Sequence, residues 1–148
     1  MPYFPNLNLK NIMTQLQFIP NKQEGQCFLV NQARCDLMVS LLNLDGSNNR
    51  IIEIGSGFGA FSDKIAKFSS HLFLIEKDPI CASYLENHFR KQYSTSRLEK
   101  RNIDFLGTIP EKSKIIVLQL DALSISWPSS DYLIANLPFN ITFPFLLK

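Results

Sequence analysis

The fold of this 148-residue chain is decided by the stretch Arg50-Ile51-Ile52-Glu53-Ile54-Gly55-Ser56-Gly57-Phe58-Gly59. Its first half is a short, mainly β-branched run, which predicts a buried strand. Its second half holds three of the chain's six glycines, and glycine suits a sharp turn that a ligand approaches closely. Apolar residues then recur at helical spacing from Phe61 to Phe68. The stretch therefore predicts a strand, a glycine loop and a helix, the order in which open α/β sheets build nucleotide sites.

The glycine loop indicates a nucleoside cofactor without choosing which one. With Ala60 in the place of the last glycine, the loop also fits the dinucleotide fingerprint G-x-G-x-x-G/A. A second apolar run, residues 72–75, ends at Glu76. Its separation from Gly55 is about the 20 residues that the fingerprint expects before a ribose-binding acid. Glu76 is therefore predicted to accept both ribose hydroxyls; the alternative is an ordinary solvated acid at a strand end.

A third apolar run, residues 115–118, is followed closely by Asp121. The carboxyl ends of parallel strands meet at one edge of a sheet, so we expect Asp121 to face the same crevice as Glu76. There it can accept a hydrogen bond from an adenine amine. Taken singly, an Asp after a strand is usually a turn former.

The tetrapeptide Asn136-Leu137-Pro138-Phe139 follows a fourth apolar run, residues 132–135, and is expected at the carboxyl end of a strand. The Asn136 carbonyl and a neighbouring backbone carbonyl can accept the two hydrogens of an exocyclic amine. Pro138 fixes the turn by locking φ, and the Phe139 ring offers a face on which a flat base stacks. This combination suits the presentation of a base amine to an electrophile. The alternative is a strand-to-turn junction at which Asn and Pro simply end the strand.

The chain carries five segments in the order Gly25-Gln26-Cys27-Phe28-Leu29, Glu53-Ile54-Gly55-Ser56-Gly57, Glu76, Asp121-Ala122 and Asn136-Leu137-Pro138-Phe139-Asn140-Ile141-Thr142. In this order they resemble the motifs of the ribosomal RNA adenine dimethyltransferases. That family uses S-adenosylmethionine (SAM) to place two methyl groups on the exocyclic amine of each of two adjacent adenosines near the end of small-subunit rRNA. The resemblance runs from about Gly25 to the last residue and is most specific in the final segment.

The resemblance implies a role for each matching residue. Asn136, Pro138 and Phe139 are the expected catalytic residues: Asn136 holds the target amine next to the transferring methyl, and Phe139 stacks on the flipped base. The expected SAM-binding residues are Cys27 and Leu29 at the methionine end, Gly55 at the amino acid moiety, Glu76 at the ribose, Asp121 with Ala122 at the adenine, and Asn136.

Two of these positions depart from the family's usual pattern. Cys27 stands where Asn or His is commoner, which puts a side-chain contact in question but leaves a backbone contact intact. Phe139 replaces the commoner Tyr, and stacking needs only the ring.

Methyl transfer from a sulfonium is an in-line displacement, so alignment and a dry pocket supply most of the acceleration. No metal, triad or tuned base is required, and His71 and His88 stand without partner spacing that would suggest catalysis. The target base must be unstacked, as single-stranded RNA allows. The expected partner is small-subunit rRNA in a pre-ribosomal particle, and a monomer is expected for the complete protein.

The predicted fold class is α/β, a Rossmann-like SAM-dependent methyltransferase sheet with strands near 50–54, 71–75, 114–119 and 131–135. The resemblance implies the strand order 3-2-1-4-5-7-6, so the sheet is expected to be incomplete, without the C-terminal strands and the helical domain of the family. Residues 1–22, Asn-rich and without acids, are expected to be a flexible tail or, alternatively, a targeting extension. Residues 23–148 are expected to form the N-terminal part of the methyltransferase domain.

Composition limits the remaining function classes. A 45% hydrophobic chain without a run of about 18 apolar residues is not expected to cross a membrane. Three cysteines without a CxxC pair indicate reduced thiols in an intracellular protein. The expected location is the cytoplasm, or the mitochondrion or nucleolus in a eukaryote.

Net charge is only +2, and the basic residues concentrate between Glu86 and Lys114. The segment between the second and third predicted strands is expected to begin with a helix that Asp78 caps and that has Pro79 at its first position. A loop at 94–96 should follow. The charges of this stretch are expected to be solvated or, alternatively, to contact phosphates. Before the first strand, a helix is expected to pack an apolar stripe on the sheet, formed by Ala33, Leu37, Met38, Leu41 and Leu42.

Two other functions remain open. The chain can be a non-catalytic relative or fragment that binds SAM, RNA or a ribosomal partner without turnover. A dinucleotide-dependent oxidoreductase is disfavoured, because nothing in such an enzyme explains the tetrapeptide at Asn136.

Overall fold

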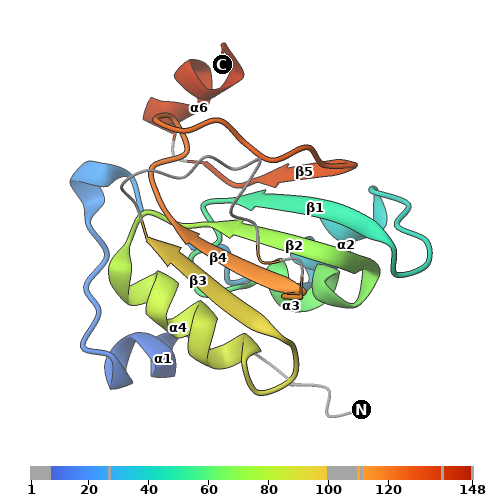
Figure 1. Ribbon diagram of the computed structural model, residues 1–148. Helices are drawn as coiled ribbons and strands as arrows, with labels where there is room; N and C mark the ends of the chain where they lie inside the picture. The colour runs from blue at the N-terminus through green and yellow to red at the C-terminus, as the bar shows by residue number, and fades with distance from the viewer. Residues whose placement is uncertain (1–7, 27, 100–109, 111, 138, 148) are drawn as a thin grey trace.

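The computed structural model of the protein describes residues 8–26, 28–99, 110, 112–137 and 139–147, with Phe139 described as backbone only. Its centre is a five-stranded sheet in the order β3-β4-β2-β1-β5, in which every neighbouring pair is parallel (Figure 1). The strands are β1 (Asn49–Ile54), β2 (Ser69–Ile75), β3 (Thr95–Glu99), β4 (Ile115–Gln119) and β5 (Tyr132–Ala135). The four strands predicted from the sequence are confirmed as β1, β2, β4 and β5. Their spatial order, β4-β2-β1-β5, is the predicted order 3-2-1-4 when the predicted strands are counted along the chain.

Five α-helices are described, namely α1 (Leu9–Gln15), α2 (Gln32–Ser40), α3 (Ser62–Ile65), α4 (Pro79–Phe89) and α6 (Phe139–Leu146), with 3-10 turns at Lys22–Glu24 and Ala66–Phe68. Helix α4 begins as predicted: the Asp78 carboxylate accepts the N–H groups of Ile80 (2.8 Å) and Cys81 (3.0 Å). Pro79 occupies the first turn, where its missing N–H needs no partner.

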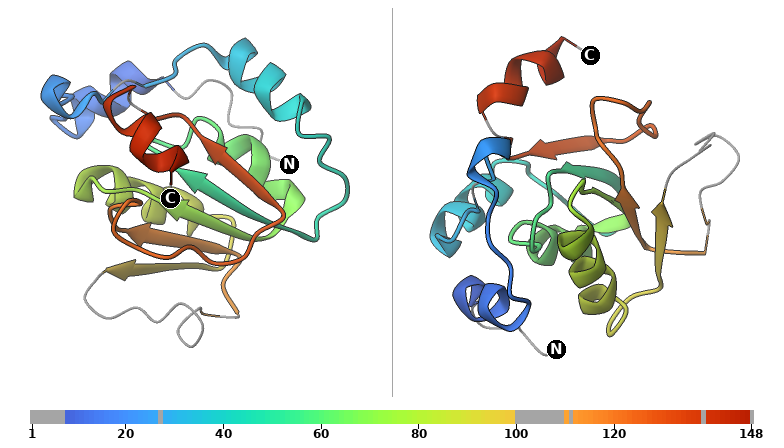
Figure 2. Two further views of the ribbon diagram at one scale, coloured as in Figure 1. Left: turned by 90° about the horizontal axis from the view of Figure 1, so that it is seen from above. Right: turned by 90° about the vertical axis from the view of Figure 1, so that its left-hand side faces the viewer.

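Each face of the sheet buries its own apolar cluster, because successive side chains of a strand point to opposite faces. Ile51 and Val117 pack with the helices of one face, including Phe61 before α3 and Leu85 of α4. On the opposite face, the cluster combines strand residues such as Phe73 with residues after β4 and with α6. The two views of Figure 2 show α4 on one side of the strands and α6 beside β5.

Strand β3 is a difference from the sequence prediction, which placed a loop at 94–96. Thr95 pairs with Ile115 and Glu99 with Gln119, so the segment extends the sheet at its outer edge. A polar sequence of this kind carries little strand signal of its own. Pairing with the buried strand β4 and contacts with α4 decide its conformation.

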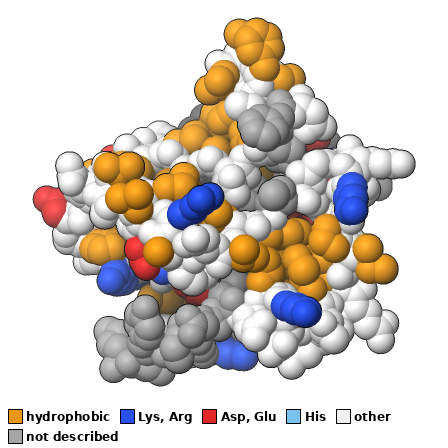
Figure 3. Space-filling view, turned by 180° about the vertical axis from the view of Figure 1, so that it is seen from behind, with side chains coloured by type: hydrophobic (Ala, Val, Ile, Leu, Met, Phe, Trp, Pro, Cys, Tyr) orange, Lys and Arg blue, Asp and Glu red, His pale blue; other side chains and the backbone are white. Residues whose placement is uncertain are grey.

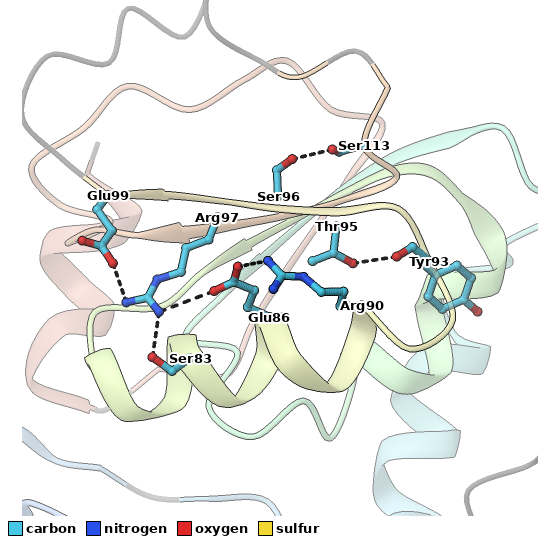
Figure 4. Close-up of polar contacts among 9 residues, drawn as sticks. All are labelled: Ser83, Glu86, Arg90, Tyr93, Thr95, Ser96, Arg97, Glu99 and Ser113. Atoms are coloured by element: carbon cyan, nitrogen blue, oxygen red, sulfur yellow. Dashed lines mark hydrogen bonds and ion pairs between the residues drawn. The ribbon is translucent and has the colours of Figure 1, made fainter.

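Arg97 of β3 provides the main polar contact with α4 (Figure 4). Its guanidinium donates to the Ser83 hydroxyl (2.7 Å) and forms ion pairs with Glu99 (2.6 Å) and Glu86 (3.6 Å). Glu86 also pairs with Arg90 one turn along the helix. Of the basic residues that were assigned to a solvated stretch, Arg97 therefore joins the strand to the helix, and Arg90 pairs within the helix end.

Residues 8–22 differ from the flexible tail expected over residues 1–22, and residues 1–7 lie outside the described residues. Helix α1 is capped by Asn8, whose side chain accepts the N–H of Asn11 (3.2 Å). Leu9 and Phe18 are buried in an aromatic cluster with Phe58 of the glycine loop. Burial of these apolar side chains orders the segment despite its polar composition.

The face that α2 turns to the core was predicted incorrectly. Leu37, Met38 and Leu41 are exposed, whereas Leu42, just after the helix, packs against the core as predicted. Within the helix, Cys35 is fully buried and Val39 packs beside it. The predicted stripe began at Ala33, which is exposed. Helical spacing alone therefore selected the wrong apolar face, because α2 carries apolar residues on two sides.

Strand β5 forms one edge of the sheet and pairs, among the described residues, with β1 alone. Leu133 on this strand is 41% exposed. Beside it, Phe143 and Leu146 of α6 and Leu147 are exposed, and Figure 3 shows hydrophobic side chains gathered at the α6 end of the molecule. In the described part of the chain, no helix combines the length and the apolar character that a membrane span needs.

We expect the 148-residue chain to self-associate through the β5 edge, since an unpaired strand edge with apolar side chains is a template for pairing. Leu133→Lys should lower the apparent mass at micromolar concentration, measured by light scattering after size-exclusion chromatography. The control is Leu41→Lys on α2, where the leucine is 73% exposed. An equal effect of both substitutions would assign association to exposed apolar surface in general, and a monomeric parent chain would contradict the prediction.

Candidate functional site

The carboxyl ends of β2, β1 and β5 lie side by side. Ile54, the last residue of β1, is in register with Ile75 of β2 on one side and with Ala135 of β5 on the other. The next residues along these strands, Gly55, Glu76 and Asn136, therefore meet at one edge. With Asp121 they line a cavity of about 290 Å³, close to the lower end of the range for small-molecule sites.

The glycine loop adopts backbone conformations that disfavour side chains. Gly55 has a φ of +70°, and a Cβ there would lie 3.5 Å from the Asn136 carbonyl oxygen. Gly57 has a φ of +55°, and a Cβ there would lie 3.0 Å from two atoms of the Phe28 ring. The positive φ therefore favours glycine at both positions, and at Gly57 the contact with Phe28 adds a steric reason, whereas 3.5 Å at Gly55 is an ordinary contact. Both glycines line the large cavity.

Glu76 is buried and fixes the glycine loop to β2. The Gly57 N–H donates to its Oε2 (2.7 Å), and the Asp78 N–H donates to its Oε1 (2.8 Å). Burial raises the pKa of Glu76, and these two N–H groups act in the opposite direction. The carboxylate lines the large cavity, where its oxygens can accept further hydroxyl donors.

Asp121 lines the cavity and also forms a turn. Its Oδ1 accepts the Leu123 N–H (2.9 Å), and its backbone carbonyl accepts the Ser124 N–H (3.0 Å). Asp121 therefore forms a turn and lines the cavity, so the two alternatives considered from the sequence are both met. Ala122 lines the cavity next to it.

Asn136 is exposed and borders two cavities. Besides the large one, it lines a water-sized cavity of about 30 Å³ together with Gly55 and Leu29. Helix α6 begins three residues later, at Phe139. Pro138, Cys27 and the Phe139 side chain lie outside the described residues, so their predicted roles stay predictions. The structure brings together the other five predicted site residues, which are Leu29, Gly55, Glu76, Asp121 and Asn136.

Glu53 is a cavity residue to which the sequence prediction gave no role. It is buried in β1, lines the small cavity, and accepts a short hydrogen bond from the Ser62 hydroxyl (2.5 Å). Burial raises the pKa of Glu53 to about 8. The signal was present in the sequence, because a carboxylate within a buried strand is rare unless it has a partner or a function.

The segment before α2 is fastened at the rim of the large cavity. Gln26 accepts the Asn21 N–H (2.7 Å) and donates to the Asp78 carboxylate (3.4 Å). Glu24 forms an ion pair with Lys77 at 3.6 Å. In Figure 1 the connection between α1 and α2 runs along the side where the strands end, which agrees with these contacts.

The histidines contribute structure. His88, for which the sequence spacing indicated no catalytic partner, lies 2.6 Å from the Asp63 carboxylate through Nε2 and stacks on Tyr84. His71 stacks on Phe73. Within the described ranges, no group of three or more His, Cys, Asp or Glu side chains is arranged to hold a metal ion.

The raised pKa of Glu53 predicts a pH dependence of stability. Its folded pKa of about 8 exceeds the ordinary value of 4.5, so its contribution is fully present at acidic pH and is lost as pH rises through 8. Between these values the free energy of unfolding should fall by about 1.4 kcal/mol per pH unit, as an upper limit. Glu53→Gln, which keeps a neutral acceptor for Ser62, should flatten this dependence in urea unfolding at pH 5.5, 7 and 8.5.

The exposed carboxylate Glu24, changed to Gln, is the control for the Glu53 measurement. It should leave the pH dependence of the parent unchanged. Parallel pH profiles for the parent and Glu53→Gln would show that the buried carboxyl does not titrate in this interval.

The chain is similar to known proteins in sequence and fold. The family model for ribosomal RNA adenine dimethylase matches residues 18–148. A probable ribosomal RNA small subunit methyltransferase A of Pyrococcus abyssi is 27% identical over 129 residues, which are 87% of this chain and 40% of that protein. The chain thus spans less than half of this curated relative.

Two solved structures show the same fold. A dimethyladenosine transferase from Plasmodium falciparum superposes with a TM-score of 0.61 at 20% identity, covering 80% of this chain and 36% of that one. The magnesium protoporphyrin IX methyltransferase of Synechocystis with bound SAM gives a TM-score of 0.51 at 13% identity, covering 88% and 56%. The predicted Rossmann-like methyltransferase fold is therefore confirmed, and the match over residues 18–148 shows that this chain belongs to the ribosomal RNA adenine dimethylase family.

Proposed function

We propose that this chain binds SAM and forms the cofactor-binding part of an enzyme that dimethylates the exocyclic amine of adenosines in small-subunit rRNA. The observation that carries the proposal is the meeting of Gly55, Glu76 and Asn136 at adjacent strand ends around one cavity. Gly55 and Glu76 suit the binding of a nucleoside cofactor, and the Asn136 amide suits the binding of a base amine.

The residues of the cavity fit SAM. The glycine loop offers backbone without side chains to the amino acid moiety. Glu76 offers carboxylate oxygens to the ribose hydroxyls, and Asp121 with Ala122 lies where the adenine would be held. Leu29 lines the small cavity beside Gly55 and Asn136, at the proposed methionine end.

SAM supplies an electrophilic methyl group when bound, and the protein aligns the nucleophile. The Asn136 amide oxygen and a backbone carbonyl accept the hydrogens of the adenine amine, which favours a pyramidal nitrogen whose lone pair points at the methyl. Phe139 stacks on the base. Transfer would form the nitrogen–carbon bond as the methyl–sulfur bond breaks, the neutral thioether would leave, and the methylated amine would release a proton to water. Because alignment provides most of the acceleration, no metal or tuned general base is required.

The wider setting follows from the same proposal. The target base is reached in an unstacked, single-stranded segment of the rRNA. The enzyme acts on rRNA within a pre-ribosomal particle as a monomer, inside the cell, in the cytoplasm or in the mitochondrion or nucleolus of a eukaryote.

Glu76→Ala should weaken SAM binding by about 1–3 kcal/mol, because ribose hydroxyls lose their acceptor. Part of this loss will arise from the glycine loop, whose Gly57 N–H also loses its partner. The measurement is isothermal titration calorimetry with SAM and NAD, and the parent should prefer SAM. The control is Glu24→Ala, an acid on the same cavity's rim.

Two results would contradict the SAM site. The first is unchanged SAM affinity in a folded Glu76→Ala protein. The second is a parent chain that binds NAD more tightly than SAM, which would favour the dinucleotide reading of the glycine loop.

Asn136→Ala should abolish methyl transfer to adenosine in small-subunit rRNA while SAM affinity stays within a few-fold, because the amide acts mainly on the target amine. Phe139→Leu should lower turnover more than SAM affinity. Transfer is measured with radiolabelled SAM, on this chain and on a longer protein that contains it, with the exposed Asn87 of α4 changed to Ala as the control. Parental rates in Asn136→Ala would refute the mechanism, and SAM binding without any transfer would favour the non-catalytic alternative.

A further inference from the structure

Trp127 closes the loop that follows β4. Its indole N–H donates to the Ala122 carbonyl oxygen (3.0 Å). Within the same loop, Asp121 accepts the backbone N–H groups of Leu123 and Ser124. These hydrogen bonds constrain the segment that carries Asp121 and Ala122 to the cavity, and the indole bond links its start to Trp127 five residues later.

The same indole contacts α6. Its ring stacks on Phe145, with centroids 4.8 Å apart and planes inclined by 24°. Phe145 is buried in the cluster of this sheet face and lines the large cavity. Phe143 and Leu146, its neighbours on α6, are exposed. The stack therefore involves the buried anchor of a helix that otherwise presents apolar side chains to solvent.

Helix α6 begins three residues after Asn136, so its position affects where the Asn136 turn lies. We propose that Trp127 is a positioning residue that couples the adenine end of the cavity, through Ala122, to α6 and the Asn136 turn, through Phe145. A ligand that fixes Ala122 then also favours the docked position of α6. By linkage, the factor by which the ligand favours docking equals the factor by which docking raises ligand affinity. This inference rests on the proposed SAM site and adds a link between cofactor binding and the placement of the target amine.

Trp127 is the chain's single tryptophan, so its emission reports on this contact directly. Titration of the parent chain with SAM and with 5′-methylthioadenosine, which lacks the amino acid moiety, should change the emission with both ligands. Each change should saturate at the dissociation constant that calorimetry gives. Hydrogen exchange should show slower exchange of α6 amides on SAM binding.

Two variants separate the two contacts of the indole. Trp127→Phe keeps a ring to stack on Phe145 but loses the N–H that bonds to Ala122. SAM affinity should therefore fall about 3- to 10-fold, the worth of one hydrogen bond, and SAM should protect α6 less than it does in the parent. Trp127→Leu loses both contacts, and SAM should no longer protect α6. Leu146→Ala, at an exposed position of α6, is the control and should leave affinity and protection unchanged.

A merely structural role for Trp127 would lower the melting temperature of both variants without removing the SAM-dependent protection of α6. Calorimetric SAM binding to the parent with unchanged emission and unchanged α6 exchange would overturn the coupling alone. No SAM binding to the parent would overturn the proposed function and the coupling with it. Because Phe145 of α6 itself lines the cavity, protection in the parent alone does not assign the coupling to Trp127. The comparison of Trp127→Phe with the parent decides the matter even where Trp127→Leu fails to fold, and equal protection of α6 in the two proteins would overturn the coupling.

Discussion

Parallel pairing of β1 on both sides is the constraint on which the site depends. Because β2 and β5 are in register with β1, three residues far apart in the sequence, Gly55, Glu76 and Asn136, emerge at the same level. The Gly57 N–H then binds Glu76 across the strand ends, which ties the loop to the neighbouring strand. Sheet formation and site assembly are therefore one event: a shift in register would separate the carboxylate from the loop that it holds.

The sequence was informative where the signal is local. Apolar runs predicted four strands, Asp78 and Pro79 predicted the start of α4, and polar residues after strand ends predicted cavity residues. It was uninformative where tertiary contacts decide. Strand β3 is polar and depends on pairing with β4 and on the ion pairs of Arg97. Helices α1 and α2 are short, and which apolar side chains they bury depends on the surfaces available rather than on helical spacing.

Glu53 shows how a site residue can be hidden within a fold signal. It lies within the apolar run that predicts β1, so the sequence gives it no separate signal as a site residue. The structure buries its carboxyl group in that strand, where Ser62 is its hydrogen-bond partner. An apolar residue there would avoid the desolvation that raises the pKa of this carboxyl. Glu53 lines the small cavity beside Gly55 and Asn136, and a local rule broken in this way is typical of a functional position.

The two sides of the cavity differ in how firmly they are held. The cofactor side rests on buried strands and on N–H bonds to a buried carboxylate. On the target side, α6 has eight residues, and Pro144 within it removes the N–H that would otherwise bond to the Asn140 carbonyl. A helix of this length has little stability of its own, so its position depends on Phe145 and the contact with Trp127. Local opening should therefore begin at α6, and the proposed contact of Asn136 with a base amine should be the part of the site most sensitive to what packs on this helix.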